Sequence, residues 1–175
     1  MHLSTKTYGP EQGLSATFRQ WKAKSHCNQI HGYALSIRLV FGCEKLDSRD
    51  WVVDFGALKP LKQQLVDMFD HKTLIAHDDP QLDRFLAMAG MLRNQDMSPR
   101  DVGKPPVMGV VVVPAVGCEA FAEMIYKMAN YWLHNSYVPS LTNDGIDPPH
   151  GLHVVLVEVR EHGANSGIYS VGGQT

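Results

Sequence analysis

One short stretch concentrates the side chains best suited to chemistry. His26, Cys27 and His31 place two imidazoles and one thiol within six residues, just before an apolar alternation that starts at Tyr33. A thiolate stabilised by nearby imidazoles can act as nucleophile, base or metal ligand. Short Cys/His clusters also recur by chance, with the cysteine as a small buried filler and the histidines as surface residues. The stretch alone leaves both interpretations open.

The elements that must position this stretch follow from hydrophobic periodicity. Apolar residues alternate over 33–43, which predicts a half-buried strand, and a second strand is predicted over 152–160. Helical spacing of apolar residues over 57–69, after the N-capping residue Asp54, and over 119–135 predicts two amphipathic helices. Strands, then helices, then a final hairpin make an α+β pattern.

Weaker signals fill the remaining chain. They predict strands at 1–8, 14–21 and 168–171, a helix over 79–93, a β-branched run at 107–113, and loops at 22–32 and 136–150.

Length and composition favour one cytoplasmic domain covering residues 1–175. The net charge is −2, from 16 basic and 18 acidic residues without a like-charge run, so nothing indicates nucleic acid or an anionic membrane as partner. Three cysteines at wide spacing argue against a disulfide framework and for a reducing compartment. The first residues lack the apolar core of a signal peptide, and no apolar stretch is long enough to span a bilayer.

Four segments, in chain order, carry a family resemblance. They are Cys27-x-x-x-His31-Gly32-Tyr33, Trp51-Val-Val-Asp-Phe-Gly-Ala-Leu-Lys59, Asp70-His-Lys-Thr-Leu74, and Val159-Arg-Glu161 followed by Tyr169. Over about residues 14–171 the chain resembles the 6-pyruvoyltetrahydropterin synthase and 6-carboxytetrahydropterin synthase family.

The resemblance implies the tunnelling fold, a four-stranded antiparallel sheet with two helices on one face. Three such sheets would join edge to edge into a barrel, and two barrels would stack into a homohexamer. The segment at about 80–106 is then an insertion that covers either the pocket or the barrel rim.

The implied activity is that of a lyase acting on a pterin. The bacterial branch converts 7,8-dihydroneopterin triphosphate to 6-carboxytetrahydropterin, acetaldehyde and triphosphate, on the way to queuosine-type deazapurines. The alternatives are a 6-pyruvoyltetrahydropterin synthase-like or aldolase-type pterin enzyme, and a non-catalytic paralogue that binds a pterin or a metal.

The resemblance also implies roles for individual residues. Cys27 would be the thiol base, and Asp70 with His71 a pair that relays or supplies a proton. Glu161 would anchor the amino-pyrimidine edge of the pterin, with Glu119 and Phe55 also contacting substrate. The alternative roles are structural: His71 follows a helix end, where the helix dipole favours histidine, and Glu161 ends a strand.

The metal motif departs from the family. Three histidines hold zinc there, whereas this chain aligns Phe18 and Tyr33 with two of them and keeps only His31. One imidazole is too few, because catalytic zinc usually takes three protein ligands.

Three interpretations follow from this departure. The site is rebuilt around His31 with His26, aided by Cys27 or His162; or the enzyme works without metal; or the protein only binds. Retention of the thiol and of the Asp-His pair favours an active enzyme. The expected cofactor is a divalent metal, with Zn²⁺ first, and His31 and His26 are the candidate ligands.

Overall fold

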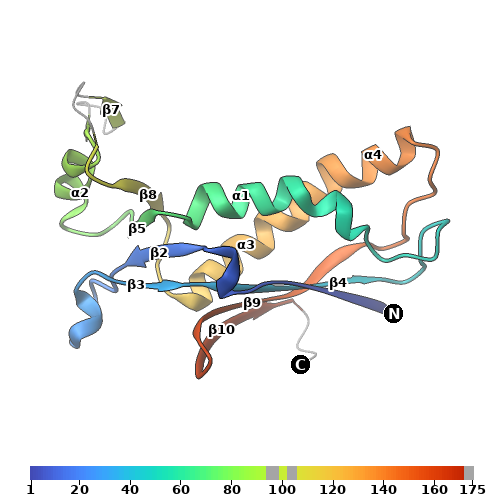
Figure 1. Cartoon of the computed structure of the whole chain (residues 1–175), viewed down its shortest axis with the longest axis horizontal. Coiled ribbons are helices and arrows are strands. Elements are labelled where there is room, and N and C mark those ends of the chain that lie inside the picture. Colours follow the sequence, from blue (N-terminus) through green and yellow to red (C-terminus); the bar gives the residue numbers. More distant parts are fainter. Residues whose placement is uncertain (94–98, 102–105, 172–175) are drawn as a thin grey trace.

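A four-stranded antiparallel sheet carries two long helices on one face (Figure 1). The computed structural model describes residues 1–93, 99–101 and 106–171. The sheet has the order β1-β4-β9-β10, with β1 at His2–Tyr8, β4 at Ser36–Cys43, β9 at His153–His162 and β10 at Asn165–Ser170. The helices are α1, Lys59–Phe69, and α3, Cys118–Trp132. The α+β class and this sheet-and-helix architecture are therefore confirmed.

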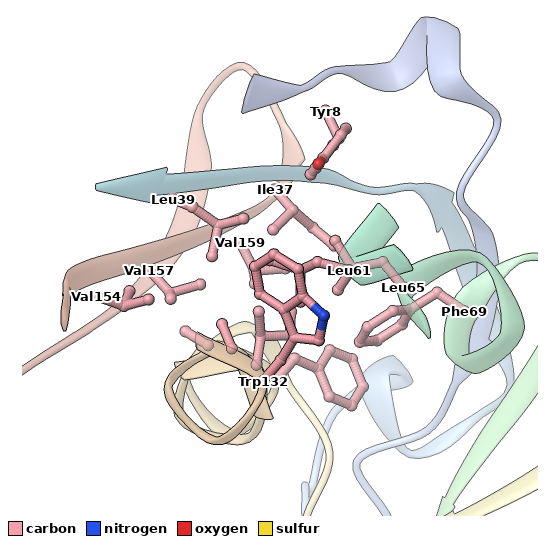
Figure 2. Packing of buried hydrophobic residues seen from close by; sticks show 14 of the residues in the cluster. Tyr8, Ile37, Leu39, Leu61, Leu65, Phe69, Trp132, Val154, Val157 and Val159 are labelled. Carbon is pink, nitrogen blue, oxygen red and sulfur yellow. The ribbon is translucent and has the colours of Figure 1, made fainter. Parts of the chain in front are cut away.

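The hydrophobic core lies between this sheet and the helices (Figure 2). Helix α1 buries Leu61, Leu65 and Phe69, which lie four residues apart and so share one helix face. Strands β4 and β9 supply side chains at alternate positions, among them Leu39 and Val157, both fully buried. The apolar residues from which these elements were predicted are therefore the residues that form this core.

A second sheet continues from the first and was not predicted. Its order is β3-β2-β5-β8, with β3 at His31–Ala34, β2 at Ser15–Phe18, β5 at Lys72–Ala76 and β8 at Gly109–Val113. Strands β3 and β4 follow each other with only Leu35 between them, so the predicted strand 33–43 is divided between the two sheets. Strand β5 pairs in parallel with both β2 and β8. This sheet pairs Phe18, the last residue of β2, with His31, the first residue of β3.

Two further predictions need correction. The helix expected over 79–93 is shorter: α2 spans Leu82–Met88, because Gly90 adopts φ +73° and turns the chain into β6, Met91–Arg93. Strand β6 pairs with β7, Pro99–Asp101, while residues 94–98 and 102–105 of the expected insertion lie outside the described residues.

The loop expected at 136–150 begins with helix instead. A π-helical turn, Leu133–Tyr137, follows α3 and leads into α4, Val138–Asn143. Pro139 is tolerated there because it occupies the first turn of α4, where no backbone donor is needed. No helix in the described part of the chain is both long and apolar enough to cross a membrane.

Candidate functional site

Four of the residues singled out in the sequence line one cavity. It has a volume of about 590 Å³ and lies where the loop after β2, the start of α3 and the β9–β10 turn meet. Cys27, His31, Glu119 and Glu161 all belong to its wall. The complete lining is Phe18, Gln20, Ala23, Ser25, Cys27, His31, Gly117, Cys118, Glu119, Glu161, Ala164, Asn165 and Ser166.

Cys27 sits in a short 3₁₀ turn, His26–Asn28, inside the loop that joins β2 to β3. The Ser25 hydroxyl accepts a hydrogen bond from the Cys27 N–H at 3.4 Å and so caps the turn. The Cys27 carbonyl accepts a bond from the Gln20 N–H at 2.8 Å, which closes the base of the loop. The thiol-bearing residue is therefore half-buried and fixed at both sides by backbone bonds.

Aromatic rings surround His31. The His31 ring centroid lies 4.9 Å from that of Phe18 and 5.8 Å from that of Tyr33, and Tyr33 in turn lies 6.0 Å from His162. Phe18 is almost fully buried and also packs edge-on against Phe121. The two positions aligned with family histidines therefore do come together around His31, but they supply a phenyl and a phenol.

This donor set does not fit a catalytic zinc ion. Phe18 has no donor atom, and the Tyr33 phenol must lose its proton to become a strong ligand. Burial, together with the charge of Glu161 nearby, raises the pKa of Tyr33 and so opposes that loss. No group of three or more His, Cys, Asp or Glu side chains is placed to hold a metal anywhere in the described residues. His26 is exposed and is absent from the cavity wall, so it does not complete a site with His31.

Glu161 and Cys118 meet at the far side of the cavity. Burial, then the charges of Glu161 and Glu119, raises the pKa of the Cys118 thiol to about 12, so this thiol stays protonated. Helix α3 can approach β10 this closely because of Gly167, where a Cβ would lie 2.3 Å from the Glu119 amide nitrogen. From the sequence, Cys118 at a helix start fits either a place in the pocket or a packing role; it belongs to the cavity wall.

Asp70 and His71 lie outside this cavity. His71 has a left-handed backbone conformation, φ +56°, and connects α1 to β5. Its Nδ1 lies 2.9 Å from Asp70 Oδ1. The His71 N–H donates to the Ser15 carbonyl at the start of β2, whereas the cavity begins at Phe18, at the end of that strand. Three strand residues separate these points by about 10 Å. Within a single copy of the chain, Asp70 and His71 therefore pair with each other but do not lie beside Cys27.

Phe55 also lies elsewhere. It is 49% exposed and borders a separate hollow of about 440 Å³ together with Trp51 and β1. Asp54, expected to cap the helix over 57–69, instead caps the 3₁₀ turn Phe55–Leu58 that precedes α1, accepting a bond from the Gly56 N–H at 2.8 Å. A substrate role for Phe55 therefore stays a prediction that the Cys27 cavity does not support.

Comparisons with known proteins agree on a family. The model of the family described as 6-pyruvoyl tetrahydropterin synthase matches residues 10–168. A 6-carboxy-5,6,7,8-tetrahydropterin synthase of Aquifex aeolicus is 29% identical over 68 residues, which cover 39% of this chain and 42% of the relative. One from Rickettsia typhi is 30% identical over 60 residues, covering 34% and 44%. The aligned stretches thus span less than half of these curated relatives.

Solved structures share the fold at low sequence identity. An uncharacterized protein from Wolinella succinogenes superimposes with a TM-score of 0.73 at 17% identity, covering 98% of each chain. The 6-pyruvoyl tetrahydropterin synthase of Plasmodium falciparum gives 0.54 at 13% identity, covering 95% of this chain and 96% of that one. Since the family model spans most of the sequence, the chain belongs to the 6-pyruvoyl tetrahydropterin synthase family.

Proposed function

We propose that this protein is a lyase that breaks the side chain of a dihydropterin. The first candidate reaction is that of 6-carboxytetrahydropterin synthase, acting on 7,8-dihydroneopterin triphosphate. The observation that carries the proposal is the convergence of Cys27, His31, Glu119 and Glu161 on one cavity. A volume of about 590 Å³ suits a small heterocycle.

The carboxylates would orient the pterin ring. The 2-amino group and the neighbouring ring N–H of a pterin form a planar pair of donors, and one carboxylate can accept both bonds side by side. Glu161 is the candidate acceptor, and Glu119 lies in the same wall. Desolvation inside the cavity would strengthen these bonds relative to water.

Cys27 and His31 would handle protons at the substrate side chain. The thiolate of Cys27 would accept a proton from a side-chain carbon, so that a C–H bond breaks and an S–H bond forms. His31 Nδ1 lies 2.8 Å from the Gln29 carbonyl oxygen, which only accepts hydrogen bonds. Neutral His31 therefore carries its proton on Nδ1 and offers the Nε2 lone pair. No step runs through a metal, because the donor set around His31 does not fit one.

A second candidate is an aldolase-type reaction on an unphosphorylated dihydroneopterin. Within the described part of the chain, the cavity wall contains two glutamates and neither lysine nor arginine. A triphosphate carries several negative charges and normally requires basic side chains or helix N-termini to bind it. The wall includes the N-terminus of α3, but it sets two glutamates and no lysine or arginine against a triphosphate, so within a single chain it favours the unphosphorylated side chain.

Turnover assays separate these reactions. The wild-type protein is incubated with 7,8-dihydroneopterin and, separately, with its triphosphate, and the aldehyde and pterin products are measured. We expect Cys27→Ala to lower kcat at least 10²-fold on whichever substrate is turned over, the usual cost of losing a general base. Cys43→Ala is the matched control, because Cys43 is fully buried in the core and does not belong to the described wall of the cavity.

Two outcomes contradict the proposal. Equal turnover by wild type and Cys27→Ala would remove the thiol from the mechanism. Absence of turnover on both substrates, with either pterin still bound, would leave a binding protein on an enzyme fold.

His71→Asn tests the Asp-His pair without disturbing the fold. His71 adopts φ +56°, a left-handed conformation that asparagine tolerates better than most residues. We therefore expect an unchanged thermal unfolding midpoint. Within one chain His71 lies away from the Cys27 cavity, so it reaches substrate only where a second copy carries it there; in that arrangement kcat should fall about 10²-fold, because an amide cannot relay a proton. His134→Asn, at an exposed position on the π-helical turn after α3, is the control. A wild-type kcat for His71→Asn would assign His71 to the turn alone.

A further inference from the structure

A buried ion pair connects the β5–α2 turn to the start of the Cys27 loop. Arg19 directly follows β2, and its Nε donates to Asp79 Oδ2 at 2.8 Å while Nη2 donates to Oδ1 at 3.0 Å. The Asp79 side chain is 0% exposed and that of Arg19 is 20% exposed. Two parallel, charge-assisted bonds fix the guanidinium plane in one orientation.

Asp79 is itself held firmly by its own turn. Its Oδ1 accepts a bond from the Gln81 N–H at 2.8 Å, and its N–H donates to the Ala76 carbonyl at the end of β5. Ala76 is the last residue of β5, which lies between β2 and β8, so the turn that carries Asp79 is bonded directly to the second sheet. Asp79 is thus a turn residue whose carboxylate is buried and fixed by hydrogen bonds.

Arg19 also bonds to the turn that carries Cys27. Its Nη1 donates to the carbonyl of Asn28, the residue after Cys27, at 3.3 Å. The next residue, Gln20, donates its N–H to the Cys27 carbonyl at 2.8 Å. The guanidinium thus connects the buried carboxylate to the far side of the loop, one peptide away from the thiol.

Asp78 holds the same loop from outside. Its Oδ1 accepts from Trp21 Nε1 at 3.1 Å, and its Oδ2 pairs with Lys22 Nζ at 2.6 Å. Hydrogen bonds from Lys22 and Trp21 lower the pKa of Asp78. Asp78 and Asp79 therefore both contact the residues at the start of the loop. The outer pair is largely exposed, with 62% of the Lys22 side chain accessible, and contributes less than the buried one.

We infer that Arg19 and Asp79 are positioning residues that hold Cys27 in the cavity. Neither residue belongs to the described wall of the cavity, so they act on substrate only through the loop. The pair also makes the Cys27 geometry depend on the β5–α2 turn, whose Asp79 lies 60 residues after Arg19 in the sequence. The catalytic meaning of this arrangement rests on the proposed role of Cys27.

Cysteine labelling tests this inference directly. Arg19→Lys retains the charge but loses the paired geometry, and Asp79→Asn retains the shape but loses the charge. Each variant, as the full chain, is treated with iodoacetamide near neutral pH, and the modified cysteine is identified by peptide mass spectrometry. Cys43 and Cys118 are buried, so their labelling reports global opening.

We expect Cys27 to be labelled several-fold faster in both variants, with Cys43 as slow as in the wild type. Where a pterin is turned over, kcat should fall about 10²-fold with KM little changed, since small misplacements of a reacting group cost that much. Glu123→Gln is the control, because it removes an exposed carboxylate paired with Lys127 on α3, away from the loop.

The outcomes separate this inference from the proposed function. Wild-type Cys27 labelling in either variant would overturn it, as would an equal rise at Cys27 and Cys43, which means general loosening. Absence of pterin turnover by the wild type would reject the proposed function, while the labelling rates would still show whether the ion pair holds the loop.

Discussion

Replacing Phe18 and Tyr33 together by histidine should turn the cavity into a zinc site. Both side chains lie against His31, with ring centroids at 4.9 and 5.8 Å, so two new imidazoles would join the existing one. His31 already donates Nδ1–H to the Gln29 carbonyl, the kind of bond that orients a metal-binding imidazole. We expect the double variant to retain about one zinc per chain after dialysis, and the wild type to retain far less.

The single variants are the matched controls for this gain. Phe18→His and Tyr33→His each provide only two imidazoles, so both should hold zinc much more weakly than the double variant. Added zinc should raise the unfolding midpoint of the double variant selectively, because a ligand that binds only the native state stabilises it. Phe18→His alone should be less stable than the wild type, because Phe18 is buried against Phe121.

This prediction fails in two recognisable ways. If the wild type retains an equimolar zinc ion, a different set of ligands must hold it. If the folded double variant binds no more zinc than either single variant, the three positions do not converge as their ring contacts indicate.

Much of the fold could be predicted because its core elements have strong periodicity. The helix at 57–69 repeats its apolar residues at the spacing that one buried helix face requires, and the strand at 152–160 is rich in valine; both appear as expected. Strand β5 was missed because its five residues, Lys72–Ala76, follow directly on a helix end. Its parallel partners β2 and β8 are distant in sequence, so tertiary pairing rather than local pattern makes it a strand.

Only the site residues that belong to local sequence motifs could be predicted. Cys27, His31 and Glu161 were identified from local segments, and the fold places them in one cavity. The ion pair between Arg19 and Asp79 has no local signal, because the two residues are brought together by the pairing of β2 with β5. The same pairing explains why Asp70 and His71, although they form part of a family motif, lie at the opposite end of β2 from Cys27.

That separation predicts how an active site would be assembled. If Cys27 and His71 act on one substrate, they must come from two copies of the chain, because within one copy β2 keeps them apart. The sheet leaves β1 and β10 as its edges, where a second copy could pair. Mixing Cys27→Ala with His71→Asn should then restore activity that neither variant has alone.

The expected recovery follows from random assembly. A shared site has both functional residues when each neighbour supplies the intact one, which gives about a quarter of wild-type activity in an equal mixture of the single variants. The doubly substituted chain Cys27→Ala/His71→Asn, mixed equally with wild type, should give the same quarter. If each chain instead held its own complete site, the single variants would stay inactive together, while the double variant with wild type would keep about half. Measuring kcat on both mixtures after joint unfolding and refolding distinguishes the two assemblies, because only a shared site makes the two mixtures equal.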